Sequence, residues 1–388
     1  MTLNYAIDKI GRRLRIGMIG GGEGSFIGAM HRMAARMDDQ FELVAGVFSS
    51  NPEKSRQTGL ALGLDPDRSY PNVSAMISAE MQRRDKIDVV AIMTPNDSHF
   101  EYAMAALDAG LDVICDKPMT NTLDDAQLLH QKVEEKKAIF CLTHNYTGYP
   151  LIRQAREMVQ RGDLGTIRLV QVEYVQGGRA DESKLMTPEM SWKYDPVRGG
   201  AARTMGDVGT HAHNLLRFVT DMEVAQVSAE IGIIVPGRAV NDYAGALLRM
   251  KNGARGTFWA TQAAAGVENG LRLRVSGTKG TLEWLQEIPQ VLTFKPLYGP
   301  IETRTPNGPG TYPSAAASSR IKAGHPEGFP EAFANLYTEA AEAICDKKVG
   351  LAGKTYHFPT SYDGLMGMRF LDAVIQSSQL DGKWVSCA

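Results

Sequence analysis

The first 146 residues alternate between short apolar runs and stretches with helical periodicity, and this alternation limits the folds open to the chain. The apolar runs lie at Arg15–Ile19, Leu43–Phe48, Val89–Met93, Val113–Cys115 and Ile139–Leu142. The stretches between them place apolar residues three or four positions apart, as a helix with one apolar face does. Runs that are apolar throughout are typical of parallel strands covered on both faces. The alternation predicts an α/β domain with a doubly wound parallel sheet over residues 1–146.

The second half reads as strand after strand with little helix between. Its apolar or alternating runs lie at Ile167–Val175, Val224–Val235, Tyr243–Met250, Thr257–Gln262, Leu271–Ser276, Thr281–Leu285 and Val291–Lys295. Residues 147–388 are therefore predicted to form an α+β domain with a large, mostly antiparallel open sheet. Helices are expected near 151–161, 331–345 and 363–377. Residues 299–328, rich in Gly, Pro, Ser and Ala, predict a functional loop or a disordered segment.

Composition excludes several classes of protein. The 388 residues carry 42 Lys plus Arg against 44 Asp plus Glu, a net charge of −2. The chain thus lacks the basic footprint of a nucleic-acid or anionic-lipid partner. It has no apolar run of about 18 residues for a membrane span, and its start does not resemble a secretory signal. Its four widely spaced cysteines favour buried thiols over disulfides. We expect a cytoplasmic enzyme with a small-molecule partner.

A glycine-rich turn follows the first predicted strand. Gly20 and Gly22 fit the first two glycines of the G-x-G-x-x-G pattern, and Ser25 stands at the third. Such a loop brings backbone N–H groups to a pyrophosphate at the start of a helix. A turn that binds nothing is the alternative, but the position between strand and helix favours NAD or NADP. The expected contacts are Gly20, Gly22, Gly24, Ser25, Phe26 and Ile27.

The end of the second apolar run lacks the acidic residue that usually binds the ribose of NAD. Ser49 and Ser50 stand there instead, and Lys54 lies close behind. The serines suit a ribose hydroxyl or a 2′-phosphate, whose charge Lys54 would neutralise. The alternative is that Ser50 and Asn51 only cap a helix. The choice between NAD and NADP stays open, with tolerance of NADP favoured.

Two polar loops follow later strands at the same predicted sheet edge. Lys117 lies in Asp116-Lys117-Pro118, where a lysine would donate to a substrate hydroxyl. Thr94-Pro95-Asn96-Asp97-Ser98-His99 ends the preceding strand. An ordinary surface lysine and a plain turn are the alternatives. The further cofactor contacts expected from these loops are Thr94, Pro95, Asn96, His99, Asp116 and Lys117.

The richest polar segment of the second half contains Asp207 and His211, four positions apart. One helical turn would place both on the same face. A histidine is the natural general base for an alcohol proton, and the carboxylate would orient it or bind substrate. A capping aspartate and a structural histidine are the alternative. Together with His213 the pair also suggests a metal set, but zinc needs three or four converging ligands and no further pair at standard spacing appears, so no metal is expected.

In combination and order, these motifs resemble the glucose–fructose oxidoreductase / inositol dehydrogenase (Gfo/Idh/MocA) family. The resemblance covers nearly the whole chain. Asp116 stands where the family usually has Glu, and Asn214 where many members have Asp. Membership would imply an N-terminal Rossmann domain, a C-terminal sheet often used to form oligomers, and sugar or cyclitol substrates. We therefore expect a homodimer or homotetramer formed through that sheet.

The resulting hypothesis is an NAD(P)-dependent dehydrogenase acting on a CH–OH group of a sugar, inositol or anhydrosugar. His211 would be the general base, Lys117 would stabilise the alkoxide, and Asp207 would fix the substrate and the imidazole. Two alternatives remain: a lyase or glycosidase that oxidises and re-reduces its substrate, and a nucleotide-sensing regulator without chemistry. The expected substrate contacts are Lys117, Tyr146, Arg153, Trp192, Asp207, His211 and His325.

Overall fold

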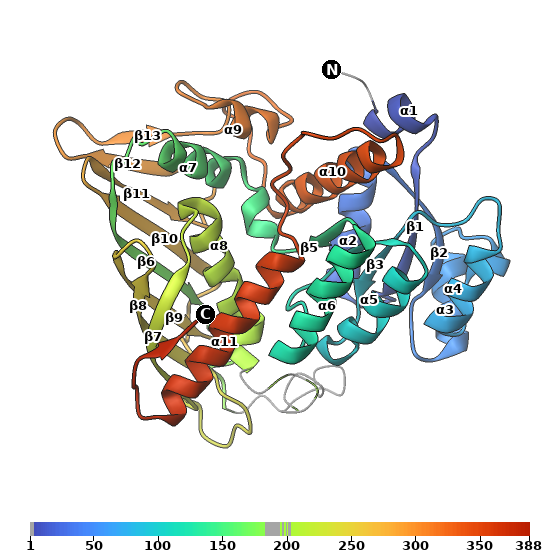
Figure 1. Ribbon diagram of the computed structural model, residues 1–388, viewed down its shortest axis with the longest axis horizontal. Helices are drawn as coiled ribbons and strands as arrows, with labels where there is room; N and C mark the ends of the chain where they lie inside the picture. Colours follow the sequence, from blue (N-terminus) through green and yellow to red (C-terminus); the bar gives the residue numbers. More distant parts are fainter. Residues whose placement is uncertain (1–3, 183–194, 196–197, 199, 201–202) are drawn as a thin grey trace. The chain divides into compact units, whose positions relative to one another are not determined.

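The structure is a computed structural model that describes residues 4–182, 195, 198, 200 and 203–388 (Figure 1). These residues divide into two compact units. The first comprises Met1–Thr120, Asp124–Asn145 and Pro330–Leu365, and the second comprises Asn121–Leu123, Tyr146–Phe329 and Met366–Ala388. The domain boundary near residue 146 stays a prediction. The compact units differ from that simple division because Pro330–Leu365 belongs with the first of them.

A five-stranded parallel sheet forms the centre of the first unit, in the order β2-β1-β3-β4-β5. Its strands are β1 (Leu14–Gly20), β2 (Phe41–Val47), β3 (Val89–Met93), β4 (Asp112–Cys115) and β5 (Phe140–Leu142). Every residue of β3 is buried, as in a parallel strand covered on both faces. The strand order reverses between β1 and β3, and ligands of open α/β sheets bind outside the carboxyl ends of strands at such a point.

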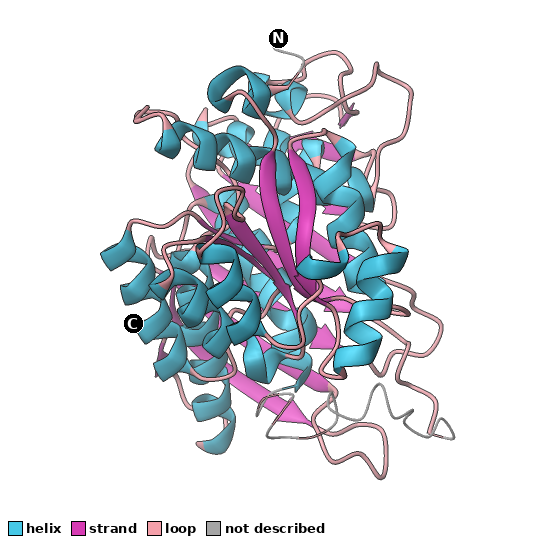
Figure 2. Cartoon of the chain, turned by 90° about the vertical axis from the view of Figure 1, so that its right-hand side faces the viewer, coloured by secondary structure: helices cyan, strands magenta, loops and turns pink. Residues whose placement is uncertain are grey.

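Helices flank this sheet (Figure 2). They are α1 (Tyr5–Ile10), α2 (Phe26–Met37), α3 (Pro52–Ala61), α4 (Val73–Met81), α5 (His99–Asp108), α6 (Leu123–Lys136) and α10 (Phe329–Lys348). Side-chain caps start four of them: Asn4, Ser25, Asn51 and Asn72 accept N–H groups of α1, α2, α3 and α4. The late helix α10 belongs here because its Tyr337 hydroxyl lies 2.6 Å from Nδ1 of the buried His31. Burial lowers the pKa of His31 to about 4, so its ring is neutral.

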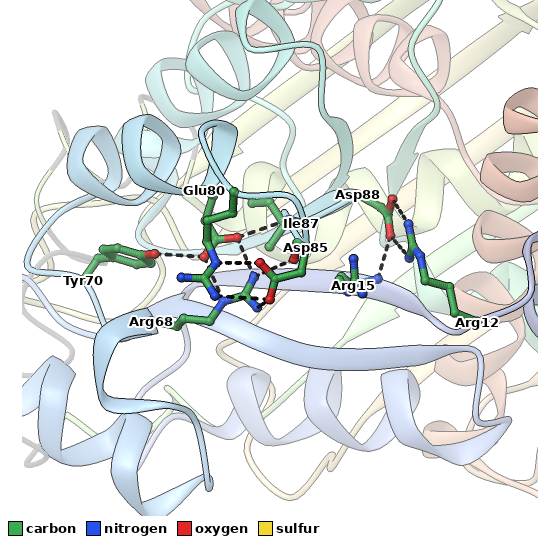
Figure 3. Close-up of polar contacts among 9 residues, drawn as sticks. Arg12, Arg15, Arg68, Tyr70, Glu80, Asp85, Ile87 and Asp88 are labelled. Carbon is green, nitrogen blue, oxygen red and sulfur yellow. Dashed lines mark hydrogen bonds and ion pairs between the residues drawn. The ribbon is translucent and has the colours of Figure 1, made fainter.

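Two ion-pair clusters hold the first unit together (Figure 3). The carboxylate of Glu80 is fully buried and accepts bonds from Arg68 (2.6 and 3.0 Å), the Tyr70 hydroxyl (2.9 Å) and the Ile87 N–H (3.2 Å). Burial and the bond to Glu80 raise the pKa of Tyr70 to about 12. In the second cluster, Asp88 accepts from Arg12, from the Arg15 N–H and from Lys348. Burial opposes ionisation of Asp88, but these donors hold its pKa below the usual value.

A nine-stranded sheet dominates the second unit, in the order β13-β12-β11-β10-β6-β9-β8-β7-β14. Only the β6–β9 pair is parallel among these strands. The strands are β6 (Ile167–Val175), β7 (Val224–Gly232), β8 (Tyr243–Met250), β9 (Arg255–Thr261), β10 (Gly270–Gly277), β11 (Gly280–Leu285), β12 (Leu292–Pro296), β13 (Glu302–Arg304) and β14 (Val385–Ser386). The predicted mostly antiparallel sheet is confirmed.

Helices lie against one face of this sheet (Figure 1). They include α7 (Pro150–Gln160) and α8 (Thr210–Thr220), which contacts β6 and β10, and α11 (Ser361–Gln379). The stretch 299–328 is not irregular throughout, because it contains β13 and the short helix α9 (Pro313–Ala317). The Ser314 hydroxyl at the start of α9 donates to Glu157 of α7 (2.5 Å), which ties this stretch to the unit.

The four cysteines are free and buried. Burial raises the pKa of the Cys115 thiol well above its usual value, so it is not a reactive thiolate. Within the described part of the chain, no helix is both long and apolar enough to cross a membrane.

Candidate active site

The glycine loop between β1 and α2 has the shape that a dinucleotide needs. Gly20 and Gly21 have φ angles of 87° and 69°, where a side chain would be strained. A Cβ on Gly22 would lie 2.5 Å from the Phe48 carbonyl oxygen, and one on Gly28 would lie 2.3 Å from that of Gly21. The predicted Ser25 hydroxyl is the N-cap of α2 and accepts the Gly28 N–H at 3.1 Å. The loop therefore forms a tight cradle at a helix N-terminus, which fits a pyrophosphate.

Arg32 of α2 is a part of this cradle that the sequence analysis missed. Its guanidinium donates to the carbonyl oxygen of Gly21. Burial lowers the pKa of Arg32. By binding this carbonyl, Arg32 holds the backbone of the loop in the orientation described above. Gly24, with a φ of 77°, has no atom within 4 Å of its Cβ position, so that side of the loop is open.

Past the end of β2, the residues predicted to contact the ribose lie at the start of helix α3. The Ser49 hydroxyl accepts the Asn51 N–H at 3.1 Å, and Asn51 in turn caps α3 by accepting the Lys54 N–H at 3.0 Å. Ser50 and Lys54 are exposed. The capping interpretation therefore holds for Asn51, while the side chains of Ser50 and Lys54 reach solvent, where a nucleotide group is accessible to them.

The loops after β3 and β4 are joined by one imidazole. His99 is 1% exposed, and its ring nitrogens lie 3.0 Å from the Thr94 carbonyl oxygen and 2.8 Å from that of Pro118. This ties the two loops at the carboxyl edge of the sheet. Asp116 accepts the Lys117 N–H (2.9 Å) and the Thr143 hydroxyl (3.0 Å), so its carboxylate fixes the backbone beside the lysine.

The remaining predicted residues of this edge lie in the same loops. Lys117 is half-buried, Asn96 is buried, and Pro95 precedes the short 3₁₀ turn Asn96–Ser98. The structure thus brings the glycine loop, the Thr94–His99 loop and Lys117 to the carboxyl ends of β1, β3 and β4. These are neighbouring strands on the ligand-binding edge of one sheet.

Asp207 lies in a single turn of π-helix, Met205–Gly209, directly before α8. Single π-helical turns inside helices are frequent at functional sites. Oxygen Oδ2 of Asp207 accepts from Arg203 (2.9 Å), Gln262 (3.0 Å) and Arg179 (3.4 Å). Arg203 is buried, with 2% of its side chain exposed. The carboxylate is therefore held between two guanidinium groups and an amide, which favours its charged form.

His211, in the first turn of α8, is surrounded by aromatic rings. The Tyr146 ring lies edge-on to it at 4.8 Å between centroids, and the Tyr174 ring lies at 6.1 Å. His211 is 6% exposed. His213, two residues on, stacks instead on Phe370 at 4.3 Å and belongs to the core. Three of the predicted residues, Asp207, His211 and Tyr146, thus come together within the second unit.

The other predicted substrate contacts are placed less favourably. Arg153 is buried and donates to the Thr147 carbonyl (3.3 Å). His325 is exposed, with Nδ1 3.2 Å from the Lys322 carbonyl oxygen. Trp192 lies outside the described residues. Asn214, one turn after His211, is 3% exposed, and its Oδ1 has no hydrogen-bond partner among the residues that the structure describes.

Metal ligands do not gather at this site. Across the described ranges, no three His, Cys, Asp or Glu side chains come together in a way that would hold a metal ion. The stacking of His213 on Phe370 separates it from the set that the sequence suggested.

Two family models match this chain, each over a different segment. Residues 14–144 match a family described as an oxidoreductase family with an NAD-binding Rossmann fold. Residues 152–283 match the GFO/IDH/MocA C-terminal domain. Among curated proteins, the chain is 34% identical over 383 residues to the uncharacterized oxidoreductase YfiI of Bacillus subtilis, covering 97% of each chain.

Two solved structures resemble the chain over nearly its whole length. An oxidoreductase from Sinorhizobium meliloti is 46% identical, with a TM-score of 0.88, and the match covers 96% of this chain and 99% of that one. An inositol dehydrogenase homolog from Azotobacter vinelandii, solved with NAD+, is 35% identical with a TM-score of 0.93, covering 97% and 98%. The same protein has also been solved with NADH and myo-inositol.

Proposed function

Since this chain belongs to the Gfo/Idh/MocA family of NAD(P)-dependent oxidoreductases, we propose that it oxidises a secondary hydroxyl of a cyclitol or sugar. The observation that carries the proposal is the setting of His211. This histidine lies one turn after a carboxylate that accepts hydrogen bonds from two arginines. The Azotobacter relative was solved with myo-inositol, which supports a cyclitol as the first substrate to test.

In the proposed reaction, a ring nitrogen of His211 accepts the proton of the substrate hydroxyl. Bound NAD+ or NADP+ would supply the hydride acceptor for the same carbon, and loss of that hydride together with the proton would turn the alcohol into a carbonyl. Lys117 donates to the substrate oxygen and offsets its developing negative charge. Asp207 binds substrate and keeps the imidazole oriented, and the buried Oδ1 of Asn214 accepts a second substrate hydroxyl.

The cofactor would be held by residues of the first unit. The N–H groups of the Gly20–Ser25 loop and the start of α2 suit the pyrophosphate. The Thr94–His99 loop and Asp116–Lys117 follow the strands on the other side of the switch point. Ser49, Ser50 and Lys54 are the proposed ribose contacts, and they suit either NAD or NADP.

A spectroscopic assay tests this function. Purified protein is mixed with NAD+ or NADP+ and a panel of inositols, sugars and anhydrosugars, and the absorbance of reduced nicotinamide is followed. We expect net reduction with at least one cyclitol or sugar. Product without net reduction would favour the lyase or glycosidase alternative. Cofactor binding without any product across the panel would favour the sensing regulator.

We also propose that the open face of the nine-stranded sheet joins copies of this chain. Leu169, Leu247 and Trp259 on neighbouring strands are 58%, 54% and 41% exposed on that face. Beside them lies a hollow of about 380 Å³ lined by residues of β6, β8, β9 and β10. Apolar side chains gathered on one face mark an interaction site.

Placing a charge on this face should separate the subunits. We expect Leu169→Glu to convert a dimer or tetramer into a smaller species, measured by light scattering coupled to size-exclusion chromatography. Leu128→Glu, on the exposed face of α6 at 53% exposure, is the matched control. An unchanged mass for Leu169→Glu would contradict this interface.

A further inference from the structure

Six polar side chains of the second unit form one hydrogen-bonded series that the sequence analysis did not detect. We refer to it as the polar belt; its members are Asp207, Gln262, Gln176, Asn269, Tyr174 and Tyr146. The topology explains why they meet. Strands β6 and β9 are parallel, so their carboxyl ends, and thus Gln176 and Gln262, lie at one edge of the sheet. Strand β10 runs antiparallel to β6, so Asn269, just before it, lies at the same edge.

The carboxylate of Asp207 fixes the direction of every bond in the polar belt. Because a carboxylate only accepts, the amide nitrogen of Gln262 must face it, at 3.0 Å. The same nitrogen donates to Oε1 of Gln176 at 2.9 Å. The amide nitrogen of Gln176 then faces Oδ1 of Asn269 at 2.7 Å. The orientation of each amide thus follows from that of the one before it.

The two tyrosines complete the series. The Tyr174 hydroxyl donates its only proton to Oδ1 of Asn269 at 2.8 Å. The Tyr146 hydroxyl, 2.5 Å from that of Tyr174, must therefore be the donor in their mutual bond. Burial raises the pKa of both tyrosines, so both hydroxyls keep their protons at neutral pH. The Tyr146 hydroxyl donates its proton to Tyr174. The part of Tyr146 that contacts the site is therefore its ring, which packs against His211.

Gln262 occupies the critical position because it is the link between the carboxylate and the rest of the polar belt. It is 4% exposed, and its amide shares Oδ2 of Asp207 with Arg203 and Arg179. A hydrogen bond to a charged group is stronger than one between neutral groups. Losing it would take the Gln262 donor away from Gln176 and would remove one of the three donors described above from Oδ2 of Asp207.

We propose that Gln262 is a positioning residue of the active site, holding Asp207 ionised and in place and orienting, through the polar belt, the tyrosine that packs on His211. This inference rests on the proposed function, since it assigns Gln262 a role through Asp207 and His211. The charged group that the Gln262 amide contacts is Asp207. Asp207 in turn contacts Arg203 and Arg179, and its charge, in addition to burial, raises the pKa of Tyr174 and Tyr146.

Gln262→Leu tests the proposal because it removes the amide while keeping a similar volume. We expect kcat/KM to fall about 10- to 100-fold, the loss expected for a hydrogen bond to a charged group. We also expect the acidic limb of its pH profile to move up by about 1 pH unit, because one donor to the carboxylate is gone. Gln262→Glu, nearly the same shape, should move the limb upward as well, because it adds a like charge beside Asp207.

Gln376→Leu is the matched control. Gln376 of α11 also donates its amide to a carboxylate, that of Asp372 at 2.6 Å, but this pair is exposed. We expect this variant to keep the wild-type rate and pH profile. The proposal would be overturned if the acidic limb of the pH profile fell at the same pH in both Gln262 variants as in the control. If Gln262→Leu fails to fold, Gln262→Met, which also lacks the amide and adds no charge, takes its place.

A direct titration separates this proposal from the function it rests on. Carbon-13 NMR of the Asp207 carboxyl group in the protein without substrate should show its protonation midpoint rising in both Gln262 variants. If Asp207→Asn keeps full activity, the role proposed for Asp207 fails, yet the NMR shift still tests whether Gln262 holds the carboxylate charged. If Asp207→Asn is inactive and the midpoint does not move in the Gln262 variants, only the role of Gln262 is refuted.

Discussion

Replacing either His211 or Lys117 should lower kcat by about 10²–10⁴-fold, the range for a lost general base or a lost group that stabilises an oxyanion. His211→Asn keeps a polar side chain of related shape but cannot take up a proton. Lys117→Ala removes a charge that would otherwise offset the alkoxide. Steady-state rates of nicotinamide reduction, with the best substrate of the panel, measure both effects.

Matched controls separate loss of chemistry from loss of structure. His130→Asn removes an imidazole of α6 whose Nδ1 lies 2.9 Å from the Ser361 hydroxyl. Lys132→Ala removes a lysine of α6 that pairs with Asp108 and Glu135. We expect both to turn over like the wild type. Cofactor binding by His211→Asn, followed by nicotinamide fluorescence, should be unchanged. Wild-type kcat in both His211→Asn and Lys117→Ala would refute the assigned roles.

Most strands of both sheets are predictable from the sequence because their signals are local, but β13 and β14 are not among those predicted. Strand β6 spans the predicted Ile167–Val175, and β8 spans the predicted Tyr243–Met250. The parallel β6–β9 pair is not predictable in this way, because it joins residues about 86 positions apart, as in the Leu169–Arg255 pairing. No period or turn motif along the chain encodes such a partner.

Helix α2 shows how a correct helix can present an unexpected face. Phe26 and Met33 are 70% and 40% exposed, and only Ala34 is buried among the residues whose spacing predicts the apolar face: Phe26, Met30, Met33, Ala34 and Met37. The buried face consists of smaller or polar residues such as Gly28, Ala34 and His31. The close approach of Gly28 to Gly21 explains this choice, because a larger residue there would displace the glycine loop. The requirements of the loop, rather than apolar periodicity, select the packed face.

The candidate site likewise contains residues that a local sequence signal identifies and residues that no such signal identifies. Lys117, Asp207 and His211 stand out in the sequence because their residue types and spacing suit proton transfer. Gln262, Gln176 and Asn269 carry no such signal, and they meet only because two parallel strands and one antiparallel strand end together. The one available hint was the cluster of amides and hydroxyls just beyond predicted strand ends, which by itself is typical of ordinary turns.

The buried carboxylate of Glu80 leads to the largest stability effect that we expect. Glu80→Ala removes an acceptor shared by the Arg68 guanidinium, the Tyr70 hydroxyl and the Ile87 N–H (Figure 3). The Arg68 side chain is only 7% exposed, so its charge would lose its buried partner and keep only the half-exposed Asp85. Breaking a buried ion pair by removing one partner costs about 3–5 kcal/mol. Urea denaturation followed by circular dichroism measures the loss.

Glu53→Ala is the control for this effect, because Glu53 pairs with Arg56 on the surface of α3, where both side chains are more than half exposed. A surface pair contributes about 0–1 kcal/mol, since water already solvates both charges. The contrast tests burial itself, as both substitutions delete a carboxylate that binds an arginine through two nitrogens. Equal losses in the two variants would mean that Asp85 and solvent compensate Arg68, and that Glu80 does not anchor the first unit.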